Sequence, residues 1–157
     1  MSSDERAVLV AYDGSAESRA AVRSAVTLFP RRRLIVVTVW EPGLATAMAS
    51  ASAIALRSPS AEMTTEMARV ERDQVARAAS AGAELARELG ATADSHAVED
   101  ETNAAVGIAS EAERHDACAV VVGSRGLGRV KAPLLGSTTQ GVLRRTRRPV
   151  VVVRTPQ

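Results

Sequence analysis

Four short aliphatic runs are the feature that most restricts how this chain of 157 residues can fold. They are rich in valine and lie at residues 7–12 (AVLVAY), 34–39 (LIVVTV), 119–122 (AVVV) and 150–153 (VVVV). Near-continuous apolar runs of this length are typical of strands that are buried on both faces, as in parallel sheets. A weaker run at residues 95–98 (SHAV) stands between two helical patterns, where a fifth strand is expected.

Helical spacing of apolar residues fills the intervals between these strands. The predicted helices are residues 16–28, 62–89, 102–114 and 137–145. Ser15 is expected to cap the first helix, and Gly90 is placed to end the second. Ser137, followed three residues later by Gln140, forms a capping-box pattern and is predicted to open the last helix.

Strands and helices therefore alternate along the whole sequence. This order predicts an α/β fold: an open, parallel, five-stranded sheet with helices on both faces and right-handed crossovers, as in Rossmann-like proteins. No linker or internal repeat divides the sequence, so residues 1–157 are expected to form a single domain. Residues 41–59 contain small side chains and prolines without a clear period, which predicts a loop.

Composition excludes several classes of function. The 20 basic and 18 acidic residues leave a net charge of +2, and only 2% of residues are aromatic, so nucleic-acid binding is not expected. The basic run at residues 144–148 is interpreted as a solvated helix end whose charge suits the helix dipole. Cys118 is the only cysteine, which excludes a disulfide framework and a cysteine-rich metal site. His96 and His115 lack partners at metal-ligand spacing, so neither is expected to bind a metal.

The N-terminal sequence MSSDER lacks the apolar core of a signal peptide. No apolar run approaches the roughly 20 residues of a membrane span. We therefore expect a soluble, cytoplasmic protein that does not contact membranes.

The stretch at residues 123–139 (GSRGLGRVKAPLLGSTT) carries the chemistry. It follows a predicted strand, and ligands of open α/β sheets bind beyond the carboxyl ends of strands. Gly123 and Gly126 are expected to let the backbone approach a ligand and adopt positive φ. Gly136 then leads into a helix N-terminus, where free amide groups and the helix dipole favour an anion. Basic residues lie between the two glycine turns, which together predict a polyphosphate site.

Two simpler nucleotide motifs do not fit this stretch. A P-loop needs Lys-Ser/Thr after its second glycine, whereas Arg129 and Val130 follow Gly128. A dinucleotide fingerprint needs a third glycine, whereas Lys131 stands at that position, and the fingerprint should follow the first strand.

The glycine spacing instead resembles the signature of the universal stress protein family, Gly-x2-Gly-x9-Gly-Ser/Thr. Gly123, Gly126, Gly136 and Ser137 occupy its four defined positions. The segments AVLVAYDGS, LIVVTVW and RRPVVVV resemble the first, second and last strands of the family, so the resemblance covers nearly the whole chain. It implies the sheet order 3-2-1-4-5 and binding of ATP, with or without Mg²⁺.

The resemblance also implies roles for individual residues. Asp13 would approach the ribose or a phosphate-bound metal, and Ala11 and Val39 would flank the adenine. The residues implied at the phosphates are Gly123, Ser124, Arg125, Gly126, Leu127, Gly128, Arg129, Gly136, Ser137, Thr138 and Thr139. Asp13 is also interpreted as a turn residue that bonds its own backbone.

These features favour a regulatory, ATP-binding module of a stress response over an enzyme. The sequence offers no Ser-His-Asp set, no paired carboxylates and no general base beyond Asp13. A slow ATPase or phosphotransferase, a cAMP-binding protein and a structural dimer with a vestigial site are the alternatives. The four valines at residues 150–153 would form an edge strand, which predicts a homodimer through that strand.

Overall fold

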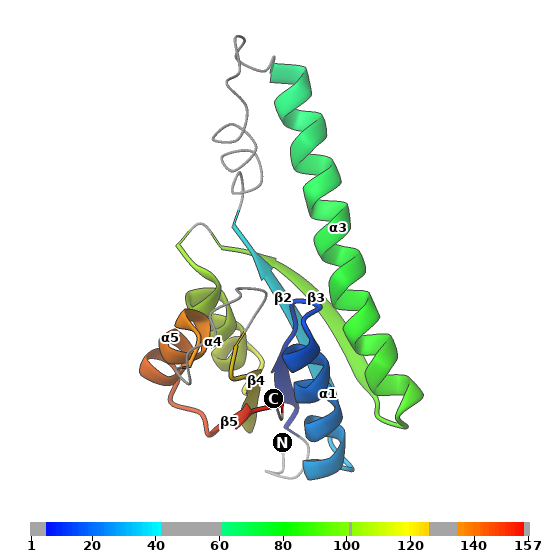
Figure 1. The fold of residues 1–157 in the computed structure, drawn as a ribbon, viewed down its shortest axis with the longest axis vertical. Helices are drawn as coiled ribbons and strands as arrows, with labels where there is room; N and C mark the ends of the chain where they lie inside the picture. The colour runs from blue at the N-terminus through cyan, green and yellow to red at the C-terminus, as the bar shows by residue number, and fades with distance from the viewer. Residues whose placement is uncertain (1–5, 42–60, 101, 126–134, 156–157) are drawn as a thin grey trace.

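A computed structural model of the chain describes residues 6–41, 61–100, 102–125 and 135–155. Its five strands form one sheet in which every ladder is parallel (Figure 1). The strands are β1 (Val8–Ala11), β2 (Leu34–Trp40), β3 (Ala93–Glu99), β4 (Ala119–Gly123) and β5 (Val150–Val153). They lie in the order β3-β2-β1-β4-β5, which confirms the predicted fold class and strand order.

Helices cover both faces of the sheet, as the alternation predicts. They are α1 (Ala16–Leu28), α3 (Ala61–Glu88), α4 (Ala104–Arg114) and α5 (Ser137–Arg145). In Figure 1, α1 and α3 lie on one side of the sheet and α4 and α5 on the other. None of the helices in the described part of the chain combines the length and apolar character that crossing a membrane requires.

Two hydrophobic cores result from this arrangement, because successive side chains of a strand point to opposite faces. On one face, Val8, Val10 and Val36 pack against α1 and α3. On the other, Leu9 and Ile35 pack against α4 and α5. Both faces of β1 and β2 are therefore buried, which explains their continuous aliphatic sequence.

The ends of two helices confirm the sequence signals. The Ser15 side chain accepts a hydrogen bond from the amide of Ser18 at 3.1 Å and so caps α1. Gly90, with φ of 90°, follows the end of α3, and the amide of Ala91 donates to the carbonyl of Ala86 at 3.0 Å. This bond, five residues back along the chain, belongs to the Schellman motif, which glycine favours.

The starts of two other helices differ from the prediction. Helix α4 starts at Ala104, not at residue 102, because Asn103 caps it by accepting from the amide of Val106 at 3.1 Å. Gly136 is the N-cap of α5, and in the described structure no side chain caps that helix, so the capping box at Ser137 was wrong. The Gln140 side chain donates instead to the carbonyl of Leu135 at 2.7 Å.

Arg148 also differs from its predicted role as a solvated residue. Its side chain is only 19% exposed and donates to Glu113 at 2.8 Å and to Asp116 at 2.7 Å. These ion pairs fasten the connection between α5 and β5 to the end of α4. The predicted loop at residues 41–59 lies outside the described residues, apart from Glu41.

Gly82 sets how closely α3 approaches the sheet, and its replacement tests this packing. A Cβ at Gly82 would lie 2.8 Å from Tyr12 Cγ and 2.8 Å from Val36 Cγ1. Glycine to alanine stabilises an exposed helix by about 1 kcal/mol, whereas overpacking a core costs about 1–3 kcal/mol. We expect Gly82→Ala to lower the free energy of unfolding by about 1 kcal/mol in urea titrations. The control Gln74→Ala, at an exposed site of α3, should not lower the free energy of unfolding. A Gly82→Ala variant that is more stable than wild type would contradict the close packing at Gly82.

Candidate functional site

A cavity of about 490 Å³ opens at the carboxyl ends of the central strands. The strand order reverses between β1 and β4, and this switch point is where open α/β sheets bind ligands. The volume lies within the range of about 300–1,000 Å³ that small-molecule sites occupy. The walls come from the ends of β1, β2 and β4 and from the first turns of α1, α4 and α5.

Most of the predicted site residues that the structure describes line this cavity. They are Ala11, Asp13, Val39, Gly123, Arg125, Gly136, Ser137, Thr138 and Thr139. Ser124 is buried and is not part of the wall. Gly126, Leu127, Gly128 and Arg129 lie outside the described residues.

The cavity has an apolar side, formed mainly by β2 and α4. Val37 and Val39 contribute from β2 and Ile108 from α4, with Ala11 at the end of β1. The hydroxyl of Thr38 donates to the carbonyl of Tyr12 at 2.8 Å and so ties the ends of β1 and β2 together. A flat, apolar group such as a purine ring would be desolvated on this side of the cavity.

The opposite side is the N-terminus of α5, which favours an anion. The amides of Ser137, Thr138 and Thr139 are the first of the helix and have no acceptor within it. Their partial positive charge is the property that binds phosphate at helix N-termini. The Gly136 amide donates to the carbonyl of Ser124 at 2.8 Å, and the Thr139 hydroxyl to the carbonyl of Gly123 at 2.7 Å. These bonds hold the start of α5 against the end of β4.

Asp13 lines the cavity and shapes the turn after β1. Its Oδ1 accepts a hydrogen bond from the amide of Ser15 at 2.9 Å, and Gly14 takes a φ of 81° in the same turn. The turn role of Asp13 is thus present in the structure. Asp13 also lines the cavity, so the turn that its carboxylate shapes forms part of the cavity wall.

Gly123 lines the cavity but differs from the prediction in its backbone angles, and its packing gives a further reason for a glycine. Its φ is not positive, so conformational freedom does not explain the glycine. A Cβ at this position would lie 2.9 Å from Glu17 Cβ and 3.1 Å from the Glu17 backbone carbon. The missing side chain therefore lets the end of β4 pack directly on the first turn of α1.

Glu17 is a residue that sequence reasoning missed. Its carboxylate accepts hydrogen bonds from the Ser124 hydroxyl at 2.5 Å, the Arg125 amide at 3.1 Å and the Thr155 hydroxyl at 3.2 Å. Burial alone would raise the pKa of Glu17, but these bonds outweigh burial and lower that pKa. The Ser124 hydroxyl thus serves Glu17 and not the cavity. The three partners of Glu17 are more than 100 positions away from it in the sequence. The sequence alone therefore shows only that Glu17 lies in the first turn of α1.

Comparison with known families completes the assignment. The model of the universal stress protein family matches residues 5–154. The chain belongs to the universal stress protein family. The resemblance that the glycine spacing indicated is thereby confirmed.

Solved structures of other universal stress proteins have the same fold. The protein from Archaeoglobus fulgidus in complex with dAMP is 19% identical, with a TM-score of 0.59 over 94% of this chain and 96% of that one. A family member from Arabidopsis thaliana with AMP bound is 16% identical, with a TM-score of 0.61 over 96% of this chain and 92% of that one. A third, in complex with cAMP, is 24% identical, with a TM-score of 0.61 over 97% and 98%. No curated protein sequence matches this chain.

The charge of Glu17 should stabilise the protein in a pH-dependent way. Glu17→Gln should unfold about 1 kcal/mol more easily near neutral pH, because an amide is a weaker acceptor than a carboxylate. Since the folded pKa lies below the ordinary value of 4.5, this stabilisation is complete above that pH and is lost as the pH falls through the folded pKa. Urea titrations at neutral pH and near pH 3 should show the difference shrinking. Glu62→Gln, in the exposed first turn of α3, is the control, and a difference independent of pH would contradict the role of the charge.

Proposed function

We propose that this universal stress protein binds ATP in the cavity between β1 and β4. The observation that supports this best is the pairing of an apolar wall with an uncapped helix N-terminus in a single cavity. The first suits a purine ring, and the second suits phosphate. The AMP, dAMP and cAMP complexes of structurally similar proteins support an adenine nucleotide as the ligand class.

The cavity gives each part of the nucleotide a place. The adenine would lie against Val39 and Ala11, and the ribose would approach Asp13. The phosphates would accept hydrogen bonds from the first amides of α5, with Arg125 supplying positive charge. Asp13 is the carboxylate that could also ligate a Mg²⁺ ion carried by the phosphates.

We further propose that the protein is a regulatory module of a cytoplasmic stress response and not a catalyst. Among the described residues that line the cavity, Asp13 is the sole carboxylate, and it is engaged in the turn after β1. General acid–base chemistry requires a positioned group near the reacting phosphate. Slow ATP hydrolysis is the alternative, and phosphate release by wild type that is abolished in Asp13→Ala would favour it.

The amide of Ser137 provides a sharp test of phosphate recognition. Ser137 is the first residue of α5, a position that tolerates proline, and Gly136 before it is extended, with φ of −61° and ψ of 156°. Ser137→Pro therefore removes the amide donor while keeping the helix, whereas Ser137→Ala removes only the hydroxyl. Calorimetry should show that Ser137→Pro lowers the affinity for ATP by roughly tenfold or more, which corresponds to the loss of one hydrogen bond to a charged group. The affinity for adenosine should not change.

Several outcomes of that titration would count against the proposal. No binding of ATP to wild type at millimolar concentration would refute the nucleotide site. Equal losses for ATP and adenosine in Ser137→Pro would mean that α5 does not bind phosphate. If cAMP displaced bound ATP at a much lower concentration than ATP itself, the preferred ligand would be the cyclic nucleotide and not ATP.

We also propose a homodimer that forms through β5. This strand ends the sheet, and its four valines are only partly buried. The amide of Val120 in β4 donates to the carbonyl of Pro149 at 2.8 Å, and the amide of Ser124, just after β4, donates to the carbonyl of Val153 at 2.7 Å. Because alternate residues of a parallel strand bond to the same neighbour, Val150 and Val152 direct their backbone groups outward. An apolar edge with unpaired backbone groups favours pairing with a second copy.

Val152→Pro tests this edge without placing a charge in the core. Proline removes the outward amide of Val152 and is tolerated at sheet edges. Light scattering should show the variant as a monomer, while Val152→Thr, which keeps the amide, should remain a dimer. Circular dichroism would verify that both variants are folded. A monomeric wild type at high micromolar concentration would refute the dimer.

A further inference from the structure

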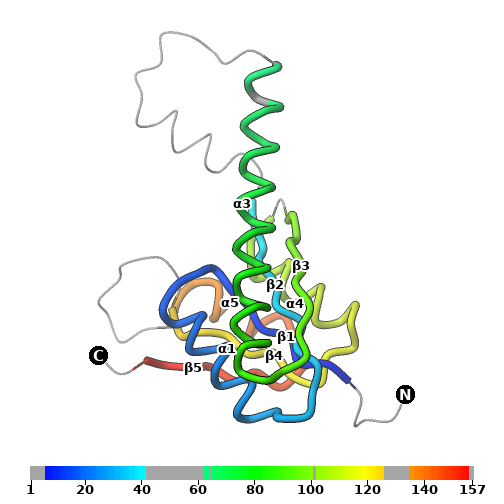
Figure 2. Tube along the Cα trace, turned by 90° about the vertical axis from the view of Figure 1, so that its right-hand side faces the viewer, coloured from blue at the N-terminus to red at the C-terminus, as the bar shows by residue number. Residues whose placement is uncertain are grey.

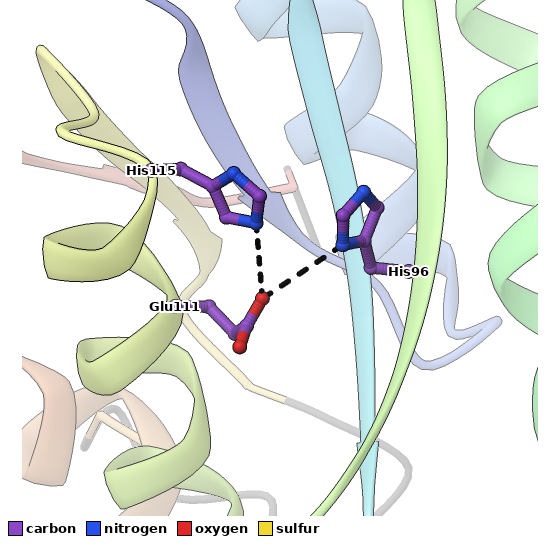
Figure 3. Close-up of side chains that lie close together, drawn as sticks. All are labelled: His96, Glu111 and His115. Atoms are coloured by element: carbon purple, nitrogen blue, oxygen red, sulfur yellow. Dashed lines mark hydrogen bonds and ion pairs between the residues drawn. The ribbon is translucent and has the colours of Figure 1, made fainter.

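The two histidines of the chain meet at one buried carboxylate (Figure 3). His96 comes from β3, Glu111 from α4, and His115 follows the last residue of α4. From the sequence, neither histidine was expected to have partners at metal-ligand spacing; the structure brings both to Glu111, so that expectation was wrong. Glu111 and His115 stand four residues apart on one helix face, a visible spacing, whereas His96 joins them only through the pairing of β3 with β2.

The position of β3 explains why the three side chains converge. His96 is paired in register with Val37, and Val37 belongs to the core beneath α4 and α5. Side chains of paired residues point to the same face of a sheet, so His96 faces α4. Figure 3 shows both imidazole rings directed at the same carboxylate oxygen of Glu111.

The spacing of the donor atoms is close to that of a metal site. His115 Nε2 lies 3.2 Å and His96 Nδ1 3.8 Å from Glu111 Oε2, and the potential ligand atoms of the three residues all lie within 4.8 Å of one another. Tetrahedral zinc with bonds of about 2.0–2.1 Å holds its ligand atoms about 3.3 Å apart. Small side-chain rotations therefore suffice to bring the three donors to coordination distance.

Burial and charge also suit a cation at this place. The Glu111 side chain is only 7% exposed, and a buried carboxylate needs a positive partner. Arg114 supplies one now, donating to Glu111 Oε2 at 2.9 Å from a side chain that is 65% exposed. The two imidazoles are 31% and 21% exposed, so an ion can enter from solvent while Arg114 swings outward.

We propose that His96, Glu111 and His115 bind a divalent transition-metal ion of the zinc type, with the remaining coordination positions open to water. Two imidazoles and one carboxylate are a ligand set that suits zinc, nickel, cobalt and copper. Magnesium and calcium prefer oxygen ligands and are not expected to bind. None of the three residues lines the cavity at the switch point, although Val37, the register partner of His96, does.

Nuclear magnetic resonance can test the site directly, because the chain has only two imidazole rings. Zn²⁺ is titrated into the full-length, tag-free protein without nucleotide, and the imidazole nitrogen and carbon-bound proton signals are followed. Both rings should shift together and saturate at one ion per chain, and Mg²⁺ should shift neither. Zn²⁺ that moves neither ring, or only one of them, would overturn the proposal.

Variants separate a metal site from a merely structural cluster. His96→Gln, on the half-exposed side of the cluster, should lower the affinity for Zn²⁺ at least about tenfold, and Glu111→Gln should do the same if it folds. Glu99→Gln, at an exposed position of the same strand, should bind Zn²⁺ like wild type. Arg114→Gln should bind Zn²⁺ several-fold more tightly, because it removes the cation that competes for Glu111. Unchanged affinity in His96→Gln, or weaker binding in Arg114→Gln, would contradict the assignment.

Discussion

Parallel pairing of β1 with both β2 and β4 is the constraint on which the rest of the structure depends. Val8, Leu9 and Val10 are fully buried, so the central strand is covered on both faces and along both edges. The chain leaves β1 towards α1 on one face and leaves β4 towards α5 on the other. A gap opens where these connections diverge. The cavity is therefore a product of topology, and its lining residues decide only what it binds.

Two kinds of charged or polar group lie at this edge of the sheet: the carboxylate of Glu17 and the first amides of α5. Glu17 accepts from Ser124, Arg125 and Thr155, and so joins α1 to the segments after β4 and β5. Its negative charge is satisfied by the protein's own donors. The first amides of α5 stay available, because neither a side chain nor Glu17 uses them in the described structure. The same edge can thus hold an internal carboxylate and an external anion.

The sequence predicted the features that depend on local pattern or on family resemblance. The strands, the helices and the cap at Ser15 followed from apolar runs and turn residues, and the family resemblance pointed to nine residues that line the cavity. The contacts of Glu17 and of His96 did not, because they arise from pairing between segments far apart in the chain. The cap of α5 was misplaced by one residue because both Gly136 and Ser137 are residues that commonly occupy N-caps. The positive φ predicted at Gly123 was wrong, and the glycine instead allows close packing against α1.

Helix α3 is much longer than the sheet it covers. Its 28 residues span about 42 Å, and in Figure 2 it runs well past the ends of the strands. Among the side chains of this helix that the structure describes, the first buried one is Ala79, whereas Met63, Met67 and Val70 are exposed. Hydrogen exchange should consequently be graded along this one helix. Amides of the last turns can open only when the core opens, while those of the first turns exchange through local fraying. A single continuous helix thus joins two regions of very different local stability.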